Sequence, residues 1–113
     1  MTAVVSWRDN YEAAQKEAEE ANHPLVLELY MEGCPHCQRL HQETHSDQAV
    51  AAALNTRFIP VRLEGRAHIE VVRQFNVTGA PTTLIFSPDG RELHRFSGFY
   101  PPPDYLKELE KYG

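Results

Sequence analysis

The two cysteines of the chain lie three residues apart in the segment Gly33–Leu40, GCPHCQRL. A pair with this spacing can form a redox-active disulfide, supply half of a metal site, or have neither role. If Cys34 lies at the N-terminus of a helix, the unpaired backbone N–H groups there favour its thiolate, the nucleophilic form. Cys37 would lie one turn further on the same face, and a disulfide could close with some local distortion. We interpret Cys34 as the attacking thiol and Cys37 as the resolving thiol.

The residues between the cysteines, Pro35 and His36, are expected to tune the pair. Pro35 suits the first turn of a helix, where its missing N–H costs little. A cationic or hydrogen-bonding imidazole at His36 would stabilise the Cys34 thiolate, and a more stable thiolate makes the disulfide more oxidising. We therefore expect Cys34 to titrate below about pH 7. The alternative is that His36 is an exposed histidine with no such role.

A metal site is the competing interpretation, because Cys34, Cys37, His41 and His45 form a series of potential ligands. In a continuous helix, Cys37 and His45 would be about 12 Å apart along the axis, whereas zinc bonds are only about 2.0–2.3 Å long. The sequence has no second CxxC, and Gln38 stands where haem attachment needs a histidine. We predict no metal and no other cofactor, and we expect His41 and His45 to lie on the surface.

Hydrophobic spacing predicts the elements that position these residues. The expected helices are 6–22 with Ser6 as cap, a helix from 34 that breaks near 45, 47–55 with Ser46 as cap, 66–75 and 101–112. The expected strands are 25–31, 57–63, 82–87 and 91–97, the last two joined by a turn at 88–90. Because helices separate the first three strands, we expect those strands to be parallel neighbours, followed by an antiparallel hairpin.

Composition narrows the classes of protein. The length of 113 residues, with 42% hydrophobic and 24% charged residues, suits one globular domain spanning 1–113. The net charge of −5 and the lack of a basic stripe argue against nucleic-acid binding. No apolar run approaches the roughly 20 residues of a membrane span. The N-terminus lacks a secretory-signal pattern, so we expect a cytoplasmic protein, or a periplasmic one if the chain is a trimmed mature form.

Two segments resemble the thioredoxin superfamily. LVLELYMEGCPHCQRL resembles its strand, CxxC active site and helix, and VTGAPTTLIFSPDG resembles its cis-proline loop, next strand and hairpin. The resemblance covers nearly the whole chain. It implies an α/β thioredoxin fold with helices on both faces of a mixed sheet and a C-terminal β-hairpin plus helix. The sheet would have four strands, or five if Ala3–Val5 forms a leading strand. The segment before Cys34, the split helix and GFYPPPDYL are similar to small bacterial thioredoxin-related proteins of the thioredoxin-7 and SoxW-like kind.

The resemblance also implies roles for individual residues. Pro81 falls at the family's cis-proline, and the Gly79–Ala80 backbone falls at the edge that pairs with an extended substrate strand. Glu28 falls at a buried acid beneath the second cysteine.

A carboxylate inside an apolar strand is costly to bury unless it has a partner or takes up a proton. We expect Glu28 to relay the proton of Cys37, the alternative being an exposed acid on a half-buried strand. The resemblance places Arg62 where many thioredoxins have a lysine near that acid, and an arginine there would at most stabilise its charge.

The expected function is thiol–disulfide exchange on protein or peptide substrates. A thioredoxin-reductase-like donor or an oxidase would be the redox partner, and the protein would be a monomer bound to neither nucleic acid nor membrane. Pro35 and His36 predict a reduction potential above the roughly −270 mV of thioredoxin. The alternative is a binding or chaperone-like module of the same fold whose cysteine pair senses redox state.

Overall fold

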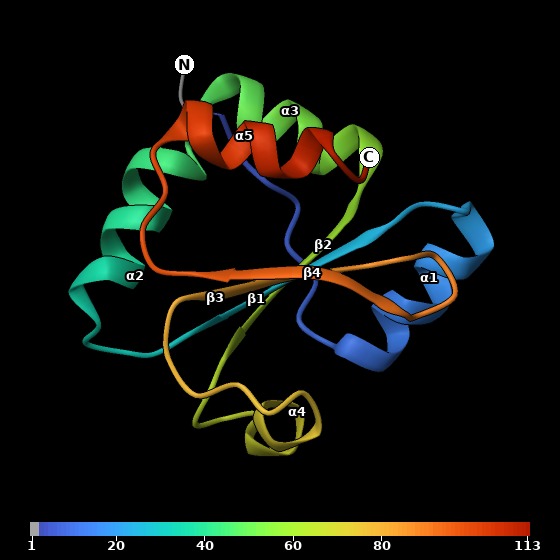
Figure 1. The fold of residues 1–113 in the computed structure, drawn as a ribbon, viewed down its shortest axis with the longest axis horizontal. Coiled ribbons are helices and arrows are strands. Elements are labelled where there is room, and N and C mark those ends of the chain that lie inside the picture. The colour runs from blue at the N-terminus through green and yellow to red at the C-terminus, as the bar shows by residue number, and fades with distance from the viewer. Residues whose placement is uncertain (1–2) are drawn as a thin grey trace.

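The computed structural model describes residues 3–113 and contains a four-stranded mixed sheet in the order β2-β1-β3-β4 (Figure 1). The strands are β1 (Leu25–Tyr30), β2 (Ile59–Glu64), β3 (Thr82–Phe86) and β4 (Glu92–Ser97). The helices are α1 (Tyr11–Ala21), α2 (Pro35–Arg39), the π-helix η1 (Leu40–Thr44), α3 (Gln48–Arg57), α4 (Ile69–Gln74) and α5 (Pro102–Glu110). The predicted α/β architecture with a hairpin and a C-terminal helix is confirmed.

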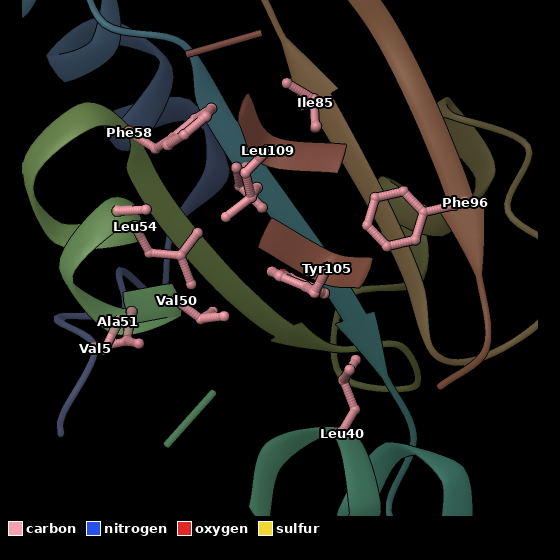
Figure 2. Close-up of a cluster of buried hydrophobic side chains, with 12 residues drawn as sticks. Val5, Leu40, Val50, Ala51, Leu54, Phe58, Ile85, Phe96, Tyr105 and Leu109 are labelled. Carbon is pink, nitrogen blue, oxygen red and sulfur yellow. The ribbon is translucent and has the colours of Figure 1, made fainter. Parts of the chain in front are cut away.

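The two faces of the sheet bury separate apolar clusters, because neighbouring residues of a strand point to opposite faces. On one face, Leu25, Leu27 and Leu29 of β1 pack with Ala14 and Ala18 of α1 and with residues of β2, β3 and α4. On the other face, Val26 lies in the cluster formed with α3, α5 and η1 (Figure 2). Glu28 shares the side of Val26, so its carboxylate points toward the layer that carries α2 and η1.

The direction of β3 differs from the prediction. β1 and β2 are parallel as expected, but β3 runs antiparallel to β1, so the prediction of three parallel strands is wrong. Within the connection 65–81, α4 has only six residues and is about 9 Å long, so this helix does not run back along the sheet. It lies at the end of the sheet where β2 ends and β3 begins (Figure 1). A parallel β3 would need a connection back along the roughly 20 Å of a six-residue strand.

The chain before α1 is held against β2, which moves the start of the helix. Arg8 forms a parallel bridge with Val61: its N–H donates to the carbonyl of Pro60 at 2.8 Å, and its own carbonyl accepts from Arg62 at 3.1 Å. Asn10 then caps α1 by accepting the N–H of Ala13 at 2.9 Å. The predicted start at Ser6 is therefore wrong, and Ala3–Val5 is irregular rather than a fifth strand.

Candidate functional site

The cysteine pair lies at the start of α2, as predicted. Cys34 is the N-cap, Pro35 occupies the first turn, and Cys37 completes that turn. The two cysteines form a disulfide with their Cα atoms 5.2 Å apart. The Cys37 N–H donates to Cys34 Sγ at 3.2 Å, and Cys37 is only 1% exposed whereas Cys34 is partly exposed. Cys34 is therefore the sulfur that an incoming protein would reach first.

The loop before β3 lies beside Cys34. The Ala80–Pro81 peptide bond is cis, and the carbonyl oxygen of Ala80 lies 3.7 Å from Cys34 Sγ. Pro81 is buried, while Gly79 is exposed and Ala80 partly so. A cavity of about 190 Å³ next to this loop is lined mostly by apolar residues, namely Leu29, Tyr30, Met31, Gly65, Val72, Val77, Thr78, Gly79 and Ala80.

His36 is exposed, and within residues 3–113 its ring makes no hydrogen bond or ion pair. The structure therefore brings no polar group to this imidazole, and its influence on Cys34 stays a prediction.

Glu28 is fully buried in the middle of β1, so it is not an exposed acid on a half-buried strand. Its neighbours across the sheet are Arg62 on β2 and Thr83 on β3. Arg62 Nε lies 3.3 Å from Glu28 Oε2, and the guanidinium carbon lies 3.7 Å from the centre of the Tyr30 ring. The predicted contact between Arg62 and Glu28 is confirmed, and it places a permanent positive charge beside the buried carboxylate.

The other oxygen of Glu28 faces His45, a residue expected on the surface. His45 Nε2 lies 2.6 Å from Glu28 Oε1, and the histidine is only 2% exposed. Neither of these two buried atoms has another hydrogen-bond partner within residues 3–113, and the contact becomes an ion pair only when His45 is protonated. The predicted surface position of His45 is wrong.

The π-helix explains the burial of His45. The backbone N–H of His45 donates to the carbonyl of Leu40 in an i→i+5 hydrogen bond of 3.0 Å, which widens the turn. Thr44 Oγ1 donates to the carbonyl of Tyr100 at 2.6 Å and anchors this turn to the chain before α5. A sequence signal existed, because Cys37, Leu40, His41, Thr44 and His45 follow the i, i+3, i+4, i+7, i+8 spacing of one helical face.

His41 continues the polar chain from His45 to the surface. The two Nδ1 atoms are 3.0 Å apart, and His41 is exposed as predicted. Partial burial, the charge of Arg62 and the neighbouring His45 lower the pKa of His41, while Glu28 opposes them.

Two aromatic residues enclose His45. The Trp7 ring lies edge-on with its centre 4.8 Å from that of His45, and the Tyr105 ring lies at 5.9 Å. Burial, followed by the charge of Glu28, raises the pKa of Tyr105 well above its usual range.

A cavity of about 230 Å³ extends from Cys37 to the outer part of the polar network, His41 and Arg62. Cys37, His41 and Arg62 all line it, together with Tyr30, Met31, Glu32, Gly33, Gln38 and Gln42. Cys37 and His41 thus border the same space. Within residues 3–113, no group of three or more His, Cys, Asp or Glu side chains is arranged to hold a metal ion.

The family model described as a thioredoxin-like domain matches residues 11–113. The chain belongs to the thioredoxin-like family. It is 30% identical over 105 residues to the thiol:disulfide interchange protein DsbD of Campylobacter jejuni, and 32% identical over 98 residues to DsbD of Yersinia pestis. These matches cover 90% and 82% of the chain but only 18% and 16% of the relatives, so the chain spans less than a fifth of their length.

Solved structures of thioredoxin-like proteins agree with the fold. A thioredoxin from Thermus thermophilus matches with a TM-score of 0.84 and 26% identity, covering 96% of this chain and 86% of that one. The C-terminal domain of Neisseria meningitidis DsbD in the reduced form matches with a TM-score of 0.75 and 20% identity, covering 90% and 93%. The thioredoxin fold predicted from the sequence is confirmed, and this domain is homologous to disulfide oxidoreductases. The finer resemblance to thioredoxin-7 and SoxW-like proteins stays a prediction.

None of the helices within residues 3–113 has both the length and the apolar character that crossing a bilayer requires.

Proposed function

We propose that this domain is a protein-disulfide oxidoreductase that exchanges disulfides through Cys34 and Cys37. The observation that carries the proposal is the asymmetry of the pair. A partly exposed Cys34 caps α2, and a buried Cys37 lies disulfide-bonded behind it. The homology to DsbD interchange proteins supports the same activity.

In the reductive direction, the Cys34 thiolate attacks one sulfur of a substrate disulfide, and the other substrate sulfur leaves as a thiolate. Cys37 then gives up its proton and attacks Cys34 Sγ. This second step forms the Cys34–Cys37 bond, breaks the mixed disulfide and releases the second substrate thiolate. The reverse sequence oxidises a substrate dithiol and leaves the domain reduced.

The substrate surface in this proposal is the Gly79–Ala80 edge beside Cys34. Its exposed backbone can pair with an extended peptide, which is a general mode of strand addition. The short distance from the Ala80 carbonyl to Cys34 Sγ would bring a peptide paired there close to the attacking sulfur. The neighbouring cavity of about 190 Å³ offers space for an apolar side chain of the peptide.

Glu28 acts as a proton relay for Cys37 in this proposal. Its burial on the face of the sheet toward α2 and η1 supports that role, and so does the contact with Arg62, which keeps a charged carboxylate tolerable there. The proton of a buried thiol needs an acceptor before the thiolate can attack, and general bases typically accelerate such steps by about 10²–10⁴-fold.

The partners and the compartment follow from the same activity. We propose protein or peptide thiols and disulfides as substrates, a dedicated electron donor or oxidase as redox partner, and a monomeric domain. Homology to DsbD proteins does not support the cytoplasmic location expected from the sequence and supports its periplasmic alternative. Trapping of the thiols in intact cells would test this, since a reducing compartment would keep Cys34 and Cys37 as dithiols.

Reduction of insulin by dithiothreitol tests the proposed activity. We expect the wild-type domain to accelerate precipitation of the insulin B chain and Cys34→Ser to abolish the acceleration. Cys37→Ser should accumulate a mixed disulfide with the substrate, because the resolving thiol is missing. Equal rates with wild type and Cys34→Ser would overturn the proposal and favour a binding module whose cysteines are not catalytic.

A further inference from the structure

The buried carboxylate of Glu28 does not end the polar network, because His45 and then His41 extend it to the surface. We propose that Glu28, His45 and His41 form a carboxylate–imidazole–imidazole relay in which His41 is the terminal base for the proton of Cys37. The inference rests on the proposed oxidoreductase activity and concerns its second chemical step.

The contacts assign the protons of the two imidazoles. In a neutral histidine, one ring nitrogen donates and the other accepts. His45 Nε2 faces the Glu28 carboxylate at 2.6 Å, so this nitrogen carries the proton and His45 Nδ1 accepts. The facing Nδ1 of His41, 3.0 Å away, must then be the donor. His41 is left with a bare Nε2, which is the basic nitrogen of an otherwise neutral ring.

The surroundings suit a relay that takes up one proton at a time. Glu28 from β1, Tyr105 from α5 and His41 from η1 all face His45. Arg62 from β2 contacts the other oxygen of Glu28. Partial burial and then the fixed positive charge of Arg62 disfavour a resting imidazolium on His41 and lower its pKa. Glu28 supplies the negative charge that a protonated His45 would need as its partner.

The relay meets the cysteine pair at the cavity of about 230 Å³ lined by Cys37, His41 and Arg62. The Cys37 S–H breaks, and its proton passes across this cavity to His41 Nε2. The Nδ1 proton of His41 shifts to His45 Nδ1, so that the new positive charge lies on His45 beside Glu28. The Cys37 thiolate then forms the bond to Cys34, and the substrate sulfur leaves with the electron pair of the mixed disulfide.

A stopped-flow experiment separates this inference from the proposed function. The reduced domain is mixed with 5,5′-dithiobis(2-nitrobenzoate), an aromatic disulfide that releases a coloured thiolate at each step. The first burst reports the attack by Cys34, and the second reports its displacement by Cys37. His41→Ala is the test variant, because His41 is exposed and its truncation leaves the core intact. His68→Ala, at the start of α4 on the opposite face, is the matched control.

We expect His41→Ala to leave the first burst unchanged and to slow the second by about a hundredfold or more, the range for loss of a general base. Added imidazole should restore the second burst in His41→Ala, since a small base can enter the space left by the side chain. It should change neither wild type nor His68→Ala. His45→Gln, with its helix content checked by circular dichroism, should slow the second burst but should not respond to imidazole.

Four outcomes are decisive. A second burst of wild-type rate in His41→Ala would overturn the relay while leaving the oxidoreductase proposal intact. Slowing of His41→Ala without rescue by imidazole would assign His41 a structural role and would likewise overturn it. Loss of both bursts in the wild type, or a first burst that persists in Cys34→Ser, would instead overturn the proposed function.

Discussion

His45 Nε2 lies 2.6 Å from Glu28 Oε1, and both side chains are almost completely buried. Taking away His45 leaves Glu28 Oε1 buried without a partner, while Arg62 contacts only Oε2, and a buried charged group with an unsatisfied atom is costly. We therefore expect His45→Leu to lower the free energy of unfolding by about 3 kcal/mol.

Urea unfolding of His45→Leu, Glu28→Gln and the double variant measures this coupling. The double variant should be more stable than the sum of the two single effects predicts, because it contains no carboxylate oxygen that has lost its His45 partner. Strict additivity would mean that the two side chains do not interact in solution.

The Cys34 thiol is expected to ionise at lower pH than a free cysteine. Its sulfur caps α2 and accepts the Cys37 N–H at 3.2 Å, a contact that stabilises negative charge. In Cys37→Ser, which has a single thiol, the ultraviolet absorbance of the thiolate should therefore rise with a midpoint below about pH 7. His36→Ala in the same background tests the contribution of the exposed imidazole and should move the midpoint upward; an unchanged midpoint would remove His36 from the site.

The N-cap of α3 is Asp47 and not Ser46, the cap predicted from the sequence. Asp47 accepts the N–H of Val50 at 3.1 Å, while Ser46 donates to the carbonyl of Gln42. We expect Asp47→Ala to lower the free energy of unfolding by about 1 kcal/mol, as for other lost N-caps. Ser46→Ala is the matched control and should cost clearly less; the opposite ranking in thermal unfolding would reassign the cap.

Tyr105 makes stability depend on alkaline pH. Its pKa is raised in the folded state by burial and by Glu28, so the folded state holds this proton more tightly than the unfolded state. Its contribution is thus fully present below the unfolded value of about 10 and is lost as pH rises above it. In chemical denaturation, Tyr105→Phe should show a shallower loss of stability above about pH 10. An equally steep loss in Tyr105→Phe would exclude Tyr105 as the source.

Much of the fold could be predicted from the sequence because its signals are local. The apolar run of β1, the proline in the first turn of α2 and the glycine turn of the hairpin each determine a short element without reference to the rest. The start of α1 could not be predicted in this way, because it depends on the bridge between Arg8 and Val61, two residues far apart in the sequence.

The same distinction applies to the site. The spacing of Cys34 and Cys37 predicted their pairing, and the resemblance to thioredoxins implied the place of Glu28 beneath Cys37. His45 becomes a partner of Glu28 only after η1 packs on the sheet. The regular α-helix predicted from the spacing does not include this wider π-helical turn. The direction of β3 likewise depends on the path of the connection 65–81 rather than on any residue within the strand.

Trp7 is the single tryptophan of the chain, and its ring lies 4.8 Å from that of His45. Because a protonated imidazole quenches indole emission on contact, the fluorescence of Trp7 reports the charge of His45. Fluorescence excited at the tryptophan band would follow the arrival of a proton at His45 in real time, without a label and without a coloured substrate.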